Sequence, residues 1–197
     1  MSWASHREER TLHSIREYEI YAAEHYPRGF SRSYFIEGNH CNSLRRIGGR
    51  EYSFGARLTE MREDLRFVPT RNRVNDVIEI RGGLKVYMHH GTKSCSNMKG
   101  RSRESKLKSK VTGLMAKGID ADVYLFGHCH RRIVFDFMGK LIVGLGTFQN
   151  TTPYIESKGN TNDVCGLILN YQRTGDRITV VPEFIEPEDI EYVSKQS

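Results

Sequence analysis

Three short hydrophobic segments of this chain are each followed at once by a cluster of glycine, asparagine and histidine residues. The segments span residues 33–37, 84–88 and 122–126, and the clusters are Gly38-Asn39-His40, His89-His90-Gly91 and Gly127-His128-Cys129-His130. Each segment has the length of a single β-strand. Open α/β sheets place their binding and catalytic groups at the carboxyl ends of their strands. The pattern therefore predicts an α/β fold whose site is assembled from three strand ends.

The rest of the chain predicts helices in its first two-thirds and strands toward its end. Residues 7–26 carry apolar side chains at near-helical spacing, and Leu107, Val111 and Leu114 recur at helical spacing before Gly118. Four later segments with strand-like composition span residues 133–137, 141–145, 164–171 and 178–184. The fold class is thus α/β with α+β character, and its latter half is mostly antiparallel.

A pair of glycines predicts a β-hairpin just before the second cluster. Gly82 and Gly83 separate two apolar segments, at residues 77–81 and 84–88. Because glycine tolerates the positive φ of a tight turn, we expect the two segments to pair as antiparallel strands. The second strand then delivers His89 to the end of the sheet.

The polar residues at the strand ends are of the kind that binds borderline divalent metal ions. Neutral imidazoles together with amide or carboxylate oxygens suit zinc, manganese and iron. Hydrolysis of a phosphoester requires neutralised charge on the phosphoryl oxygens and a nucleophile made from water, and two divalent metals about 4 Å apart supply both. A lone histidine at a strand end is more often a hydrogen-bonded structural residue, but three clusters in order favour a metal site.

The three clusters resemble the third, fourth and fifth sequence blocks of the calcineurin-like metallophosphoesterases. In that family the blocks run D-x-H, G-D, G-N-H-D/E, H and G-H-x-H, and the last three resemble Gly38-Asn39-His40, His89-His90-Gly91 and Gly127-His128-Cys129-His130. The resemblance covers residues 31–184. It implies part of a four-layer β-sandwich flanked by helices, with the N-terminal strands absent, and a hydrolase that acts on phosphoesters, including phosphodiesters.

The resemblance also implies a role for each polar residue of the clusters. Two divalent ions (Mn, Fe or Zn) are expected for the family, although this chain alone is expected to hold one more readily than a pair. The implied metal ligands are Asn39, His89 and His128 for one ion and His130 for the other. His40 would face the substrate and stabilise the leaving group or a phosphoryl oxygen. His90, the alternative to His89, and Lys93 would bind the substrate.

The chain departs from the family pattern at two places. Neither D-x-H nor G-D occurs before Gly38, and the first aspartate of the chain is Asp64. In addition, Cys41 stands where the family has an acid beside its catalytic histidine. We therefore expect a single truncated domain over residues 1–185, followed by a tail over residues 186–197. Two explanations stay open: a separate polypeptide, or a homodimer, supplies the missing ligands, or the chain is a relative that binds without cleaving. The first is favoured.

Composition predicts a soluble, cytoplasmic protein with an affinity for polyanions. The net charge is +6 with a pI near 9.2, no apolar run approaches the length of a membrane span, and the start lacks a secretory signal. The basic stretch over residues 93–110 is read as a solvated helix face. The alternative is that it lies over the site and makes nucleic acid a partner or substrate.

The cysteines are expected to be reduced. The four of them are widely scattered and form no C-x-x-C pair. Cys41, Cys95 and Cys129 lie near histidines, so a structural zinc site is an alternative, but their spacings match no compact zinc module.

Overall fold

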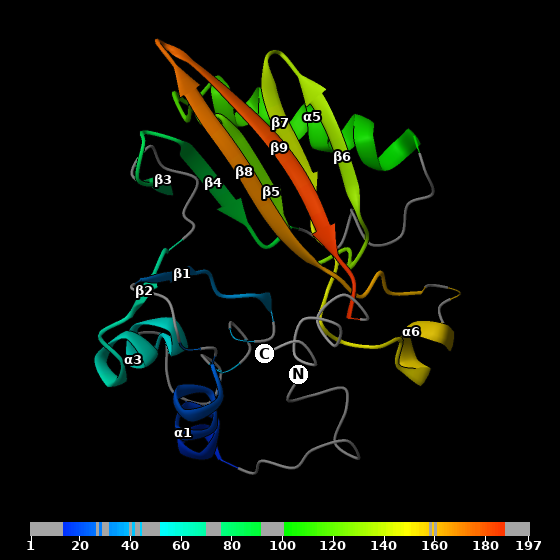
Figure 1. Ribbon diagram of the computed structural model, residues 1–197. Helices are drawn as coiled ribbons and strands as arrows, with labels where there is room; N and C mark the ends of the chain where they lie inside the picture. The colour runs from blue at the N-terminus through cyan, green and yellow to red at the C-terminus, as the bar shows by residue number, and fades with distance from the viewer. Residues whose placement is uncertain are drawn as a thin grey trace, which may run out of the picture. The chain divides into compact units, whose positions relative to one another are not determined.

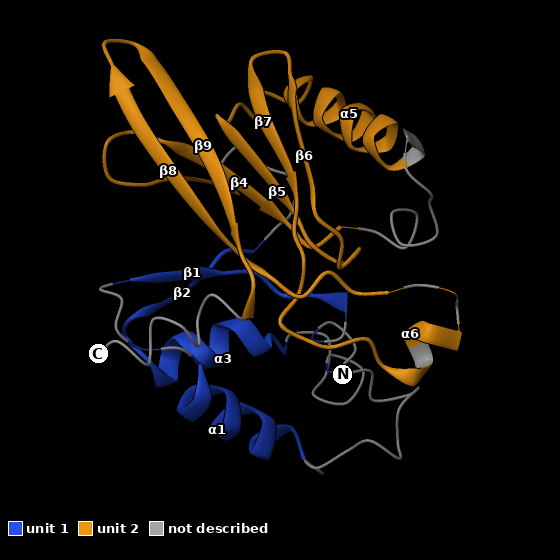
Figure 2. Ribbon diagram, turned by 45° about the vertical axis from the view of Figure 1, so that its right-hand side comes forward, with its two compact units in different colours: residues 1–71 blue, residues 72–197 orange. Residues whose placement is uncertain are grey.

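The computed structural model describes most of the chain, and it divides the chain into two compact units, residues 1–71 and residues 72–197 (Figure 2). The described residues are 14–26, 28, 32–39, 41, 44, 52–69, 76–91, 101–157, 159 and 161–187. The single-domain interpretation of the sequence stays a prediction, as does the tail, most of which lies outside the described residues.

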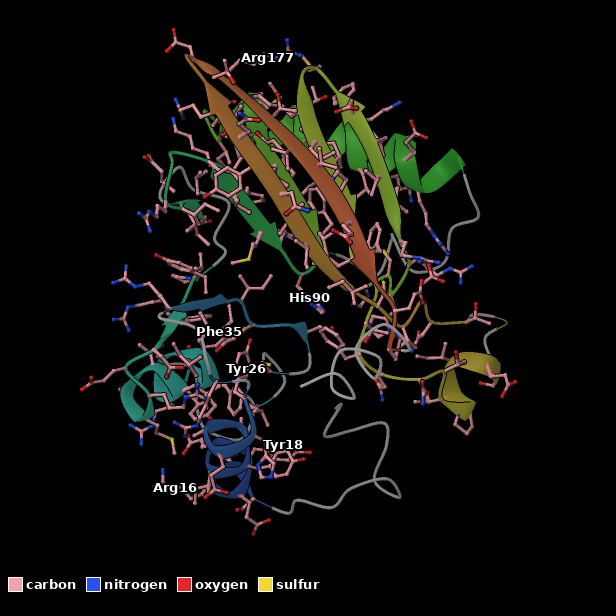
Figure 3. All side chains as sticks on the ribbon, in the orientation of Figure 1. Arg16, Tyr18, Tyr26, Phe35, His90 and Arg177 are labelled. Carbon is pink, nitrogen blue, oxygen red and sulfur yellow. The ribbon has the colours of Figure 1, made fainter. Side chains whose placement is uncertain are left out.

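The first unit combines two helices with a pair of parallel strands. Its elements are α1 (Ile15–His25), β1 (Ser33–Phe35), α3 (Phe54–Met61) and β2 (Leu65–Phe67) (Figure 1). β1 pairs with β2 in parallel. Ala23, Phe35, Leu58 and Leu65 form the core of this unit. Tyr26 and Phe35, labelled in Figure 3, add a tilted ring contact with centroids 5.9 Å apart.

A buried arginine joins α1 to the segment before β2. Arg62 is 5% exposed and donates to the main-chain oxygens of Ala23 (3.2 Å) and Tyr26 (2.7 Å) at the end of α1. Its guanidinium also forms a two-pronged ion pair with Asp64. Helix ends leave carbonyl groups without intrahelical partners, so this side chain satisfies acceptors that would otherwise be buried unpaired.

The second unit is built on a five-stranded mixed sheet. Its elements are β3 (Val77–Glu79), β4 (Lys85–His89), α5 (Arg101–Met115), β5 (Val123–Phe126), β6 (Ile133–Phe137), β7 (Lys140–Gly144), α6 (Pro153–Ser157), β8 (Gly166–Thr174) and β9 (Arg177–Ile185). The sheet order is β3-β4-β5-β7-β6. Since β4, β5 and β7 run parallel, their carboxyl ends share one edge of the sheet, which is the edge that carries the histidine clusters.

The two faces of this sheet are covered by different layers (Figure 1). α5 packs against one face through Leu107, Val111 and Leu114, which are at most 3% exposed. The β8–β9 hairpin covers the other face with side chains such as Leu169 and Val180. A helix and a second β-layer thus bury the strands from both sides, which accounts for their nearly continuous apolar sequences.

The mixed α/β architecture predicted from the sequence is confirmed, together with most of the elements in the second unit. The glycine hairpin joins β3 to β4, and Gly82 and Gly83 have φ of 82° and 80°. The sequence interpretation missed α3, β2 and α6. α3 is an eight-residue helix capped by Ser53, and a helix this short depends more on tertiary packing than on its own propensity.

Two further expectations from the sequence concern membrane spans and disulfides. Among the described residues, no helix combines the length and the apolar character that a membrane span requires. No disulfide joins the cysteines of the described part of the chain.

Candidate functional site

The ends of β4 and β5 bring two of the histidine clusters side by side. His89 is the last residue of β4 and pairs with Phe126, the last residue of β5, in the parallel ladder. The ladder continues one step further, because the Gly127 N–H donates to the His89 carbonyl at 3.0 Å. The residues that follow, His90 and His128, therefore leave the sheet next to each other.

His90 and His128 are in direct contact through their ring nitrogens. His90 lies just beyond the end of β4 (Figure 3), and its Nε2 is 3.1 Å from Nδ1 of His128. The rings meet edge to face, with centroids 5.0 Å apart. Two neutral imidazoles satisfy this distance when one of them donates a proton to the other. Two imidazoles that ligate one tetrahedral metal at about 2.0–2.1 Å also hold their nitrogens roughly 3.3 Å apart.

Glycine is required at position 91 for this approach. Gly91 has φ +93°, and a Cβ at this position would lie 2.7 Å from the Gly127 carbonyl oxygen and 3.1 Å from Cβ of His128. A side chain would therefore meet backbone that has no freedom to yield. The glycine lets the loop after β4 pass close enough to the loop after β5 for the two rings to touch.

The backbone of the third cluster is held in an uncommon conformation. His128 and His130 have φ of 71° and 51°, in the left-handed region that non-glycine residues rarely adopt. Such conformations cost of order 1–3 kcal/mol each and persist where the surrounding structure fixes them. His128 and His130 thus lie in a loop with a strained backbone.

Asn162 fixes the ring of His130. The Asn162 amide donates through Nδ2 to the carbonyls of Gln149 (3.0 Å) and Asn150 (3.2 Å), so its Oδ1 is the atom that faces Nδ1 of His130 at 3.1 Å. An amide oxygen only accepts, which places the proton of His130 on Nδ1. In the neutral ring Nε2 then carries the lone pair, as a metal ligand requires.

Asp163 holds the same loop from the other side. Its carboxylate accepts from Nη1 of Arg131 (2.9 Å) and from the backbone N–H of Arg132 (2.7 Å), and its own N–H donates to the His130 carbonyl (2.8 Å). Neither Asn162 nor Asp163 was singled out in the sequence. They lie about thirty residues from the cluster they support, in a loop of ordinary polar composition, so only the folded chain reveals them.

His89 is engaged differently from its neighbour. Its Nδ1 accepts from the Gly91 N–H at 2.8 Å, which places the proton of the neutral ring on Nε2. Burial, and next the positive charge of Lys110, lower the pKa of His89 to about 4, so the ring is neutral near pH 7. To bind a metal ion, His89 would have to give up the hydrogen bond from Gly91 or change its tautomer.

Within the second unit, the structure brings together part of the predicted site. Within the described residues, no three His, Cys, Asp or Glu side chains lie close enough to hold a metal ion. Asn39 belongs to the first unit, where its side chain is exposed, whereas the four described histidines of the clusters belong to the second. His40 and Lys93, the predicted catalytic and substrate-binding residues, lie outside the described residues. The metal and substrate assignments therefore stay predictions.

No family model matches the chain, and no curated protein matches it in sequence. The chain is similar in structure to a double mutant of Vps29 from Entamoeba histolytica, with a TM-score of 0.40 and 13% identity over 92% of this chain and 89% of that one. It is also similar to wild-type Vps29 of the same organism complexed with zinc (TM-score 0.30, 14% identity, 55% of this chain and 58% of that one). A third similar structure is a novel archaeal phosphodiesterase (TM-score 0.35, 17% identity, 76% and 68%).

Proposed function

We propose that the edge of the sheet at the ends of β4 and β5 binds a divalent cation, and that the chain works as part of a calcineurin-like metallophosphoesterase that hydrolyses phosphoesters. The observation that carries the proposal is the 3.1 Å approach of His90 Nε2 to His128 Nδ1 at the ends of adjacent parallel strands. The partial four-layer sandwich that the three sequence clusters imply is part of the same proposal.

The donor set of this edge suits a borderline metal ion. The facing ring nitrogens of His90 and His128 have a spacing that two ligands of one metal ion also have. Gly91, in the loop after β4, makes that spacing possible. His130 is held by Asn162 with its Nε2 lone pair available, so it is the candidate ligand for a second ion. A bound divalent ion would neutralise charge on the phosphoryl oxygens and lower the pKa of an attacking water.

Two imidazoles do not complete a catalytic metal site, which has about three protein ligands. Asn39, His40 and a polypeptide carrying the D-x-H and G-D blocks stay the predicted sources of the remaining groups. His89 and His90 are alternatives for the same ligand position, and the hydrogen bond from Gly91 to His89 favours His90.

Metal titration of purified variants tests the binding half of the proposal. We expect Zn²⁺ or Mn²⁺ binding, measured by calorimetry, to weaken at least about 10-fold in His90→Ala and in His128→Ala. His89→Ala should retain binding. The matched control is His25→Ala, because His25 is an exposed histidine at the end of α1 whose ring contacts the Tyr21 carbonyl. Equal binding in all four variants would overturn the assignment.

An assay of phosphoester hydrolysis tests the catalytic part of the proposal. The purified chain is supplied with Mn²⁺ and an activated phosphodiester or monoester, with and without a polypeptide that carries the two other sequence blocks. Hydrolysis that is lost in His128→Ala supports a phosphoesterase. Metal binding without hydrolysis in either mixture would leave a metal-binding protein and exclude the proposed catalysis.

A further inference from the structure

One side of α5 carries three positive side chains in a row. Arg103, Lys106 and Lys110, here called the basic stripe, are spaced three and four residues apart. Residues at these spacings lie on the same side of an α-helix, so the stripe runs for about 10 Å along it. Lys106 is exposed, and Arg103 and Lys110 are partly so, because the neighbouring side of the helix is buried through Leu107.

The acidic residue of α5 pairs with a lysine outside the stripe. Glu104 forms its ion pair with Lys108, one turn further along the helix. Lys108 in turn lies over the rings of Phe135 and Phe137, with Nζ 5.3 Å and 5.8 Å from their centroids. Glu104 and Lys108 therefore occupy the β6 side of the helix, away from the basic stripe.

The stripe is placed where it does not favour the helix. Cations stabilise the last turn of a helix and oppose the positive end of its dipole, yet α5 has no basic residue in its last turn, and Arg103 lies in its first turn. Lys106 and Lys110 are also like charges at i, i+4, which costs a few tenths of a kcal/mol. Charges arranged against the stability of their own helix point to a role in binding an anion.

Lys110 of the stripe acts electrostatically on one histidine of the second cluster. Lys110 is close enough to His89 for its charge to act on that ring, second only to burial among the causes that lower the pKa of His89. The stripe and the candidate metal site lie in the same unit.

Over residues 103–115, the exposed side chains of α5 are not those that a membrane-binding helix uses. Interfacial helices insert residues such as Trp, Phe and Leu beside their cations. Apart from Lys106 and Lys117, the exposed positions over residues 103–118 are instead small or polar: Ser105, Ser109, Thr112, Gly113, Ala116 and Gly118. A surface of cations among small polar groups fits a phosphate backbone, since duplex DNA presents about one negative charge per 1.7 Å of its axis.

We infer that the basic stripe of α5 binds the phosphate backbone of a nucleic acid. The contact is electrostatic and independent of sequence, because lysine and arginine side chains that reach phosphates carry no base readout. The inference goes beyond the proposed function, since binding by the stripe requires neither a metal ion nor turnover. Together with the proposed function, it makes the phosphodiester of a nucleic acid the substrate class.

Fluorescence anisotropy of the full chain with labelled single-stranded and duplex oligonucleotides, in EDTA, tests the inference apart from any metal site. We expect binding that weakens steeply between about 50 and 200 mM salt. The double variant Lys106→Gln/Lys110→Gln should bind about 10-fold more weakly, and the slope of log affinity against log salt should become shallower by about two for a duplex.

The matched control removes the same charge from elsewhere in the unit. Lys108→Gln/Arg177→Gln changes the opposite side of α5 and the tip of the β8–β9 hairpin (Figure 3), and it should bind within about 2-fold of the parent. Equal weakening by both double variants would mean that net charge alone attracts the nucleic acid. That result overturns the inference, as does binding to phosphatidylserine vesicles without binding to either oligonucleotide.

Discussion

The side-chain oxygen of Asn162 lies 3.1 Å from Nδ1 of His130, and the side-chain amide nitrogen of Asn162 donates to the carbonyls of Gln149 and Asn150. The orientation of the His130 ring is therefore set by the loop between α6 and β8. Replacing Asn162 with leucine removes the acceptor and frees the ring to rotate. If His130 ligates a metal ion, we expect Asn162→Leu to weaken binding at that position about 10- to 100-fold, measured by calorimetric titration with Zn²⁺ or Mn²⁺.

Asn170 provides the control for this variant. Its side chain contacts Glu183 across the β8–β9 hairpin and lies on the exposed face of that hairpin. Asn170→Leu should leave metal affinity unchanged. A metal titration in which Asn162→Leu matches the parent would show that His130 does not need its Asn162 contact to bind, or does not bind.

Gly91 and Gly139 allow backbone strain to be separated from steric conflict. Both have positive φ, +93° and +71°, but a Cβ at Gly91 meets the Gly127 carbonyl at 2.7 Å, whereas a Cβ at Gly139 meets nothing within 4 Å. Gly139→Ala should therefore lower the free energy of unfolding by about 1 kcal/mol, through φ alone. Gly91→Ala should cost about 1–3 kcal/mol more, because the loops must separate. Urea unfolding followed by circular dichroism measures both, and equal losses would contradict the close approach of the loops.

The elements that the sequence predicts well are those whose pattern is local. The glycine pair at residues 82–83 and the apolar spacing in α5 each contain their own signal, and the structure has a hairpin and a helix at these places. The short helix α3 depends on tertiary packing, because eight residues are too few to form a helix from their own propensity. Its existence therefore could not be deduced from the sequence alone.

The candidate site shows the same division. The position of the histidines at strand ends followed from the sequence, because each cluster directly follows a hydrophobic segment. The contact between His90 and His128 did not follow from the sequence. His89 and His90 are adjacent, and only the direction of each side chain at the end of β4 decides that His90 contacts His128. The support from Asn162 comes from a distant loop and leaves no local pattern.

Asp64 should make the stability of the first unit depend on pH. The hydrogen bonds and charge of Arg62 hold the pKa of the Asp64 carboxyl below its usual value. Because the folded pKa is lower than the unfolded one, the carboxylate stabilises the fold above the unfolded pKa, and this contribution is lost as the pH falls through the folded value. We expect Asp64→Asn to be less stable than the parent near pH 7, and the gap in stability to close as the pH falls through the folded pKa of Asp64.

Urea unfolding at a series of pH values measures this gap. The same substitution in an Arg62→Met background supplies the control, because the cation that lowers the Asp64 pKa is then missing. In that background the difference in stability between the chains with and without Asp64→Asn should lose most of its pH dependence. A gap that stays constant from pH 7 to low pH in the parent background would contradict the ion pair.

Glu37 caps α3 from the segment that leads to Asn39. It is 8% exposed, and its Oε1 accepts from the backbone N–H of Gly55 (2.8 Å) and from the hydroxyl of Ser53 (2.9 Å) at the start of the helix. A carboxylate at a helix N-terminus satisfies orphan donors and complements the dipole. Glu37→Ala leaves the Gly55 N–H buried and unpaired, so it should cost about 2–3 kcal/mol of unfolding free energy, and Glu37→Gln about 1 kcal/mol.

Glu60 provides the control for the Glu37 variants, because it is a glutamate of α3 itself whose side chain is 60% exposed. Glu60→Ala should change the unfolding free energy by no more than about 0.5 kcal/mol. Urea unfolding of the three variants tests the order. If Glu37→Ala cost as little as Glu60→Ala, the strand that ends before Asn39 would not be anchored to α3, and the position of Asn39 would be set by other contacts.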